Sequence, residues 1–223
     1  MKLKTPLLSL AFAGTLILSA CSNPDASSPS ASTSPDGAQS MPGMDHGSMK
    51  DHGSMNMSLG PKDENFDLRF LDGMTPHHDG AVVMAQEALQ KSQRPEIKQL
   101  AQAIIEAQKK EIAQMQQWRK AWYPNVGDTP MMYSAEMGHM MPMSAEMKSS
   151  MMMNVDLGAA DNQFDLRFIN AMVPHHEGAL VMAQEALQKS DRPEIKQLAQ
   201  EIISSQQQEI SQMQQWKKAW YGQ

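Results

Sequence analysis

An internal duplication constrains this chain of 223 residues more than any other feature of its sequence. Phe66 to Tyr123 aligns without a gap with Phe164 to Tyr221 at an offset of 98 residues, and 44 of the 58 aligned positions are identical. Self-similarity on this scale indicates that one structural unit occurs twice. The fold must therefore be built from two similar units that pack against each other.

Each copy contains two helical patterns separated by a short break. The breaks are Lys91 to Pro95 and Lys189 to Pro193, and the proline that ends each one suits the first turn of a helix. From Ile97 onward, apolar residues recur at steps of three and four, so they form one stripe. We predict an all-α four-helix bundle from two helical hairpins, residues 62–123 and 161–222, within a domain that spans 61–223.

The first 20 residues are predicted to be an export signal. Lys2 and Lys4 precede an apolar stretch that is too short for an ordinary transmembrane helix. The following Leu18-Ser19-Ala20-Cys21 resembles the bacterial lipoprotein processing box, which makes Cys21 a candidate for lipid attachment. An ordinary signal peptide cut nearby is the alternative. Both interpretations place the mature protein in the periplasm or outside the cell, with Cys21 as its one expected membrane anchor.

Residues 21–60 are predicted to form a disordered tether, since their first half is almost entirely small and polar. From Met41 to Met57 the tether becomes rich in Met and His, and Asp45-His46-Gly47-Ser48-Met49 recurs six residues later. These repeats resemble those of bacterial copper-resistance proteins, with a simple low-complexity tether as the alternative. The segment between the hairpins, 124–160, is also rich in Met and is expected to be a disordered linker.

The composition limits the possible functions. The chain has 22 Met but one Cys, and its net charge is −6. These values exclude a disulfide scaffold, a cysteine-based zinc or iron–sulfur site and a basic nucleic-acid-binding protein. Thioether chemistry is the first explanation for so many methionines, and core filling is the alternative.

A Met and a pair of adjacent His occur together in the first helix of each hairpin. At 100° per residue, Met74 shares one helix face with His77 and His78. Antiparallel pairing within the hairpin places Met115 near this face, and the second copy repeats the arrangement. Neutral thioether and imidazole ligands favour Cu(I), or the similar Ag(I), over hard cations. We also hypothesise that Gln108 and Gln206 hydrogen-bond the histidines and orient their rings.

The predicted metal ligands of the bundle are Met74, His77, His78, Met115, Met172, His175, His176 and Met213, with Met84 and Met182 ranked lower because they lie seven residues from a histidine. Those of the tether and linker are Met44, His46, Met49, His52, Met55, His139 and Met140.

Several motifs resemble those of a bacterial family long labelled as of unknown function. They are Phe66-Asp67-Xaa-Xaa-Phe70, Met74-Xaa-Pro76-His77-His78, and a second-helix pattern that runs from Gln108 through Glu111 and Met115 to Trp118. The resemblance covers about residues 62 to 223 and implies a ferritin-like four-helix bundle. Together with the Met-rich segments, it extends to the family's cyanobacterial copper-resistance members, which implies periplasmic copper binding through these Met and His residues.

The leading hypothesis is a binding protein that sequesters or delivers Cu(I) outside the cytoplasm without catalysis, with Cu(II) and Ag(I) as further cargo. Copper efflux or sensor proteins are expected partners, and nucleic acid is not. One alternative is a Cu(I) oxidase. A ferritin-like di-iron oxidase is disfavoured because the one Glu-Xaa-Xaa-His motif, Glu136 to His139, lies in the linker. A non-metal adaptor with a Met-filled core is the third possibility.

Overall fold

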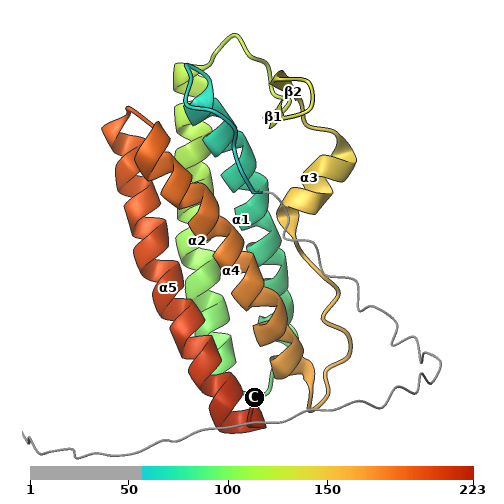
Figure 1. The fold of residues 1–223 in the computed structure, drawn as a ribbon. Coiled ribbons are helices and arrows are strands. Elements are labelled where there is room, and N and C mark those ends of the chain that lie inside the picture. The colour runs from blue at the N-terminus through green and yellow to red at the C-terminus, as the bar shows by residue number, and fades with distance from the viewer. Residues whose placement is uncertain (1–56) are drawn as a thin grey trace, which may run out of the picture. The chain divides into compact units, whose positions relative to one another are not determined.

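The computed structural model describes residues 57–223, and four long helices lie side by side in it (Figure 1). They are α1 (Phe66–Lys91), α2 (Pro95–Trp122), α4 (Phe164–Lys189) and α5 (Pro193–Tyr221). The predicted all-α bundle of two hairpins is confirmed. The export signal, Cys21 and the tether ligands Met44, His46, Met49, His52 and Met55 lie outside the described residues. No helix within 57–223 has the length and apolar character needed to cross a membrane.

The two hairpins meet along α1 and α4, which run antiparallel. A side chain built on Gly73 of α1 would approach Met182 of α4, whereas one on Gly178 of α4 would approach His77 of α1. One residue number therefore rises as the other falls along this interface. The apolar stripes of α2 and α5 complete the core, with Ile97 and Ile195 fully buried.

Tryptophans and arginines close both ends of the bundle. Arg94, between α1 and α2, lies 4.1 Å from the centroid of the Trp220 ring of the other hairpin and 3.4 Å from the Asp165 carboxylate. Arg192 lies 4.2 Å from the Trp122 ring centroid in the reciprocal position. Cation–π contacts of this kind stabilise the hairpin pairing. Trp122 and Trp220 thus have a structural role at the ends of the bundle.

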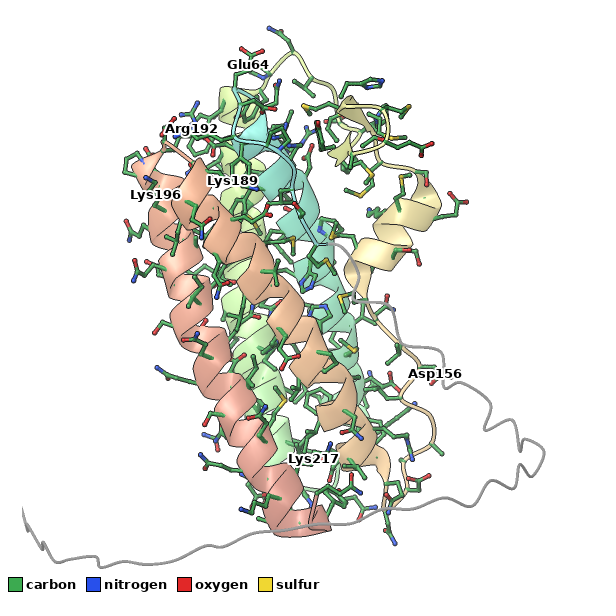
Figure 2. All side chains as sticks on the ribbon, viewed as in Figure 1. Glu64, Asp156, Lys189, Arg192, Lys196 and Lys217 are labelled. Atoms are coloured by element: carbon green, nitrogen blue, oxygen red, sulfur yellow. The ribbon has the colours of Figure 1, made fainter. Side chains whose placement is uncertain are left out.

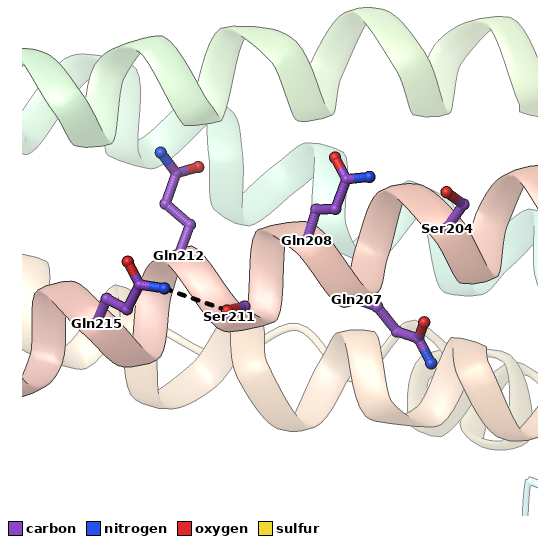
Figure 3. A pocket seen from close by; sticks show the side chains of 6 residues that line it. All are labelled: Ser204, Gln207, Gln208, Ser211, Gln212 and Gln215. Atoms are coloured by element: carbon purple, nitrogen blue, oxygen red, sulfur yellow. Dashed lines mark hydrogen bonds between the residues drawn. The ribbon is translucent and has the colours of Figure 1, made fainter. Parts of the chain in front are cut away.

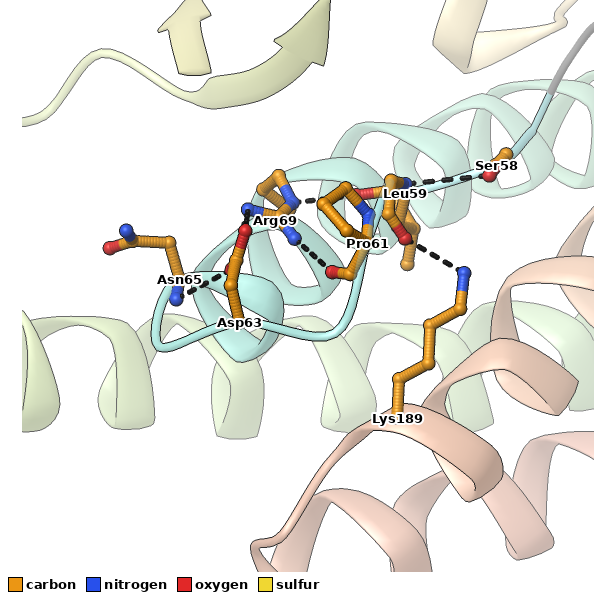
Figure 4. A network of polar contacts seen from close by, with 8 residues as sticks. Ser58, Leu59, Pro61, Asp63, Asn65, Arg69 and Lys189 are labelled. Atoms are coloured by element: carbon orange, nitrogen blue, oxygen red, sulfur yellow. Dashed lines mark hydrogen bonds and ion pairs between the residues drawn. The ribbon is translucent and has the colours of Figure 1, made fainter. Parts of the chain in front are cut away.

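The duplication extends further upstream than the sequence comparison predicted, because a strap precedes each hairpin. The first strap is residues 57–65. Arg69 donates to its Leu59 and Pro61 carbonyl oxygens, each at 2.6 Å, and Lys189 of the other hairpin donates to its Gly60 carbonyl oxygen at 2.7 Å (Figure 4). Arg167 and Lys91 repeat these bonds on residues 155–163. Each strap therefore ties the two hairpins together.

The expectation of a disordered linker is wrong. Residues of the linker form a two-stranded antiparallel sheet, β1 (Met131–Ser134) with β2 (His139–Pro142), followed by the short helix α3 (Ala145–Met152). The buried Asp72 of α1 anchors this segment, since its carboxylate accepts from Arg119 and from the Met131 amide, the latter at 2.7 Å. Burial raises the pKa of Asp72, and these donors partly offset that effect.

The outer face of α5 differs in character from the linker side of the molecule. Sulfur atoms gather in the bundle and over the linker (Figure 2). A shallow depression on α5 is lined instead by neutral polar side chains (Figure 3): Ser204, Gln207, Gln208, Ser211, Gln212 and Gln215. Because it offers neither thioether nor imidazole, this depression has none of the predicted soft ligands.

Candidate metal centre

Four histidines are buried where α1 meets α4. His77, His78 and His176 are 0% exposed and His175 is 1% exposed. The rings of His77 and His175 are in contact across the interface, with centroids 3.9 Å apart. Within each pair the rings are farther apart, at 6.5 Å for His77–His78 and 6.2 Å for His175–His176. The structure therefore brings both predicted pairs into one cluster.

Glycines make room for this cluster. Gly80 and Gly178 each lie two residues after a histidine pair; Gly80 faces the linker helix α3, and Gly178 faces His77 of the other hairpin. A Cβ atom on Gly178 would lie 3.1 Å from Nε2 of His77, and one on Gly80 would collide with the Met152 carbonyl oxygen. The Gly that follows each His-His sequence is thus required by close packing.

Glutamates orient one histidine of each pair. Nε2 of His78 lies 2.8 Å from the Glu111 carboxylate, and Nε2 of His176 lies 2.6 Å from that of Glu209. Because a carboxylate accepts, each Nε2 carries the proton and each Nδ1 keeps its lone pair. The hypothesis that Gln108 orients these rings is wrong, as is that for Gln206. The side-chain oxygen of each amide has no hydrogen-bond partner.

Several imidazole nitrogens are buried without a hydrogen-bond partner. These are both ring nitrogens of His77 and the Nδ1 atoms of His78, His175 and His176. Nε2 of His175 donates to the Met152 carbonyl oxygen at 3.1 Å, so its Nδ1 also holds a lone pair. Burial, followed by repulsion from neighbouring imidazoles, lowers the pKa of His175 to about 3 and that of His77 well below its usual range. His77 and His175 are therefore neutral, and they present unused electron pairs to the buried interior.

Two thioethers that were not among the predicted ligands lie next to His77. The position of a Cβ on Gly178, 3.1 Å from Nε2 of His77, is also 3.4 Å from Sδ of Met153 and 3.5 Å from Cε of Met57. Sulfur and nitrogen therefore converge beside α4. The Met-rich linker pointed to such residues, but the sequence pattern gave no reason to select Met153 or Met57.

The six predicted bundle methionines are fully buried, as the helical pattern indicated: Met74, Met84, Met115, Met172, Met182 and Met213. The contacts His78–Glu111 and Asp72–Arg119 support the expected level of Met115 beside Met74. Met182 approaches α1, with Sδ 3.7 Å from a Cβ position on Gly73, one turn before His77. Met182 was ranked low as a ligand because it lies seven residues from a histidine of its own helix. That ranking left out the histidines of the other hairpin.

The predicted linker ligands His139 and Met140 both lie in the two-stranded sheet. They are consecutive residues of β2, so their side chains point to opposite faces of the sheet. Met140 is paired with Tyr133, whereas His139 is paired with Ser134.

The cluster differs from a hard-metal site. Among residues 57–223, no three side chains of the His, Cys, Asp and Glu types are grouped so that they could hold one ion. Two nitrogens of a histidine pair, supplemented by thioether sulfur, would give a low coordination number with neutral soft ligands, which suits Cu(I).

A groove connects this region with solvent. It has a volume of about 1040 Å³ and lies between α4 and the segment that follows α3. Met57, Met153 and Gly178 line it together with the exposed Pro174 and Glu177. An ion could thus reach the thioethers beside His77 without unfolding of the bundle.

Sequence and structure comparisons identify relatives of the chain. The domain of unknown function DUF305 matches residues 17–119 and 67–217. The chain belongs to the DUF305 family. The solved structure of CopM in its Cu(I)-bound form is 37% identical, with a TM-score of 0.54, over 70% of this chain and 97% of CopM. Its Cu(II)-bound form gives a TM-score of 0.55 at 37% identity over 70% and 98%. This DUF305 resemblance was expected from the His-His and Gln-Glu-Met-Trp motifs.

Two further relatives are more distant or shorter. A DUF305 protein from Streptomyces coelicolor, described as secreted, is 27% identical with a TM-score of 0.51, over 65% of this chain and 86% of that protein. An uncharacterized protein of Acanthamoeba polyphaga mimivirus is 45% identical over 49 residues. That match spans 22% of this chain and only about a third (32%) of the viral protein.

Proposed function

We propose that this protein binds Cu(I) at the buried histidine pairs, with thioether support, and sequesters or delivers it without catalytic turnover. The observation that carries the proposal is the set of buried imidazole nitrogens that have no hydrogen-bond partner. Leaving such groups unsatisfied costs free energy, so their retention calls for a ligand. A cation that accepts their lone pairs supplies the missing interaction.

The spacing within each pair supports a two-coordinate ion. With metal–nitrogen bonds of about 2 Å and about 1.1 Å from a ring nitrogen to its centroid, linear ligation separates the centroids by about 6.2 Å. The ring centroids are 6.5 Å apart in His77–His78 and 6.2 Å apart in His175–His176. An ion therefore fits between the rings of one pair with little rearrangement, provided that the two nitrogens turn toward it.

The charge of the surroundings favours a monovalent ion. Neutral His and Met ligands leave the full ionic charge in a buried site, where desolvation is costly. Glu111 and Glu209 provide one carboxylate beside each pair, bonded to the outer nitrogen of His78 or His176. One negative charge can offset one Cu(I) or Ag(I), but it only half offsets a divalent ion. Cu(II) is accordingly the weaker cargo at these sites.

The relatives support copper as the ion. CopM structures exist with Cu(I), Cu(II) and Ag bound, and CopM aligns with 70% of this chain. We extend the same cargo to this protein, together with a role in copper resistance outside the cytoplasm. The predicted export signal and the secreted Streptomyces relative support that location. Copper efflux or sensor proteins remain the proposed recipients, and Cys21 the proposed anchor.

Anaerobic titration of Cu(I) against a chromophoric chelator tests the proposal. The wild-type chain should compete for Cu(I), and a variant with Leu at all four histidines should lose the tightest equivalents. Equal competition by both proteins would contradict the assignment. Oxygen consumption is measured in parallel: none is expected on addition of Cu(I), and catalytic consumption would favour an oxidase. If neither protein competes for Cu(I), a non-metal adaptor is the better description.

A further inference from the structure

The sheet of the linker has two faces with different surroundings. The register pairs Met132 with Met141 and Ser134 with His139, so these side chains share one face. The other face carries Tyr133, and it packs on the bundle. The Tyr133 ring lies 5.5 Å from the Arg69 guanidinium carbon and against Gly60. The face with Met132, Met141 and His139 is therefore turned away from this contact.

Two thioethers on that face are close enough to hold one ion. Residues directly opposite each other in an antiparallel sheet have Cβ atoms about 5 Å apart. Two flexible Met side chains that start at this separation can place both sulfurs at about 2.3 Å from a soft ion between them. Met132 and Met141 are both only partly buried, so solvent ions can reach them.

His139 has the correct tautomer to act as a third ligand. Its Nδ1 lies 2.8 Å from the Met140 carbonyl oxygen. A carbonyl can only accept, so Nδ1 carries the proton and Nε2 keeps its lone pair. His139 is exposed and lies two residues before Met141 on the same strand face. A backbone carbonyl that fixes the ring in this way is a common support for metal-binding histidines.

We infer that Met132, Met141 and His139 form a second, solvent-facing site for a monovalent soft ion, separate from the buried histidine pairs. The site rests on the proposed function only for the identity of its natural ion, Cu(I). It is held in place by Asp72, whose carboxylate accepts from the amide of Met131 at the start of β1. An exposed site on an anchored sheet can take up ions that the buried centre receives more slowly.

The test is a titration of the full chain, labelled with ¹³C at the Met methyl groups, with Ag(I) nitrate followed by NMR. The methyl signals of Met132 and Met141 should shift together, and the substitutions M132L and M141L should abolish the site. The matched control is M131L/M140L, which removes two methionines of the same strands from the opposite face and should leave both shifts intact. His139→Gln retains both thioethers and should weaken Ag(I) binding at this site about 10-fold.

The outcomes separate this inference from the bundle site. Shifts of the Met153 methyl without shifts of Met132 and Met141 would overturn the second site and leave the proposed function standing. Shifts of Met132 and Met141 alone would support the second site and contradict the buried one. If M132L/M141L loses its fold by circular dichroism, His139→Gln decides, and unchanged Ag(I) affinity in that variant overturns the three-ligand site.

Discussion

The two hairpins have nearly the same sequence but different surroundings, and the difference shows how one duplicated unit yields two unequal sites. The linker packs on the first hairpin, where Pro76 is buried and Asp72 pairs with Arg119. At the equivalent positions the second hairpin has an exposed Pro174, with Asn170 and Lys217 in place of the ion pair. The start of the linker is therefore anchored on the first copy alone, through Asp72 and Arg119.

The inequality reaches the histidines. Nε2 of His175 donates to the Met152 carbonyl oxygen, whereas Nε2 of its counterpart His77 has no partner and lies beside Met153 and Met57. Nε2 of His175 is therefore already bonded to a carbonyl oxygen, whereas Nε2 of His77 has the side chains of Met153 and Met57 nearby. We expect the first pair to bind Cu(I) more tightly because it has an additional soft ligand within reach.

The largest expected effect follows from removing one pair at a time. His77→Leu with His78→Leu should weaken the tightest Cu(I) equivalent at least about 100-fold, because both nitrogen ligands are lost. His175→Leu with His176→Leu should remove a weaker equivalent and leave the tightest one in place. Anaerobic chelator competition measures both. If the two double variants lose the same equivalent, the hairpins form one joint site and the comparison fails.

The anchor can be broken by giving the first copy the residues of the second. Asp72→Asn with Arg119→Lys should lower the free energy of unfolding by about 2 kcal/mol, because a buried, hydrogen-bonded ion pair is lost. It should also speed proteolysis between β1 and α3. The matched control is the reverse exchange, Asn170→Asp with Lys217→Arg, which has no linker to hold. Equal changes in denaturant midpoint for both exchanges would contradict the proposed anchoring role.

The carboxylates are a feature that the two copies share. Glu111→Gln retains an acceptor for His78 but removes the negative charge, so Cu(I) affinity of the first pair should fall about 10-fold. Glu209→Gln should do the same to the second pair. Glu106→Gln, on the exposed face of α2, is the control and should have no effect. A 10-fold loss in the control would show that the charge acts over long range instead of through the histidine.

The last prediction concerns pH. The pKa of His175 is about 3 in the folded chain, against about 6.5 in an unfolded one. Below about pH 6.5 the unfolded chain binds a proton that the folded chain does not. The free energy of unfolding therefore falls as the pH is lowered, by up to about 1.4 kcal/mol per pH unit for each such histidine. His175→Leu should make the slope shallower between pH 6.5 and 4.5. Identical slopes in urea unfolding would contradict this.

The sequence predicted the bundle and the histidine pairs because both depend on local patterns. Apolar steps of three and four define the stripes, and the His-His step places both rings near one helix face. Predictions from the sequence failed where a residue's neighbours depend on how the two hairpins pack against each other. Met182 reaches the level of Gly73 only because α1 and α4 are antiparallel. The orienting role was assigned to Gln108 instead of Glu111 because both lie near one helix face, and only the observed contacts distinguish them.

The linker shows the other limit of local reasoning. Its Met, Gly and Pro content is typical of a loop, yet the segment forms β1, β2 and α3, and Asp72 and Arg119 hold its start. Arg119 also donates to the carbonyl oxygens of Gly127 and Thr129. Such long-range anchors leave no periodic signal.

X-ray absorption at the copper edge of protein loaded anaerobically with one equivalent of Cu(I) tests the central claim most directly. The account predicts a two- or three-coordinate ion with imidazole nitrogen at about 2 Å and no more than one or two sulfurs at about 2.3 Å. The nitrogen signal should disappear when all four buried histidines, His77, His78, His175 and His176, are replaced by Leu. A coordination shell of sulfur alone, or one unchanged by these substitutions, would contradict it.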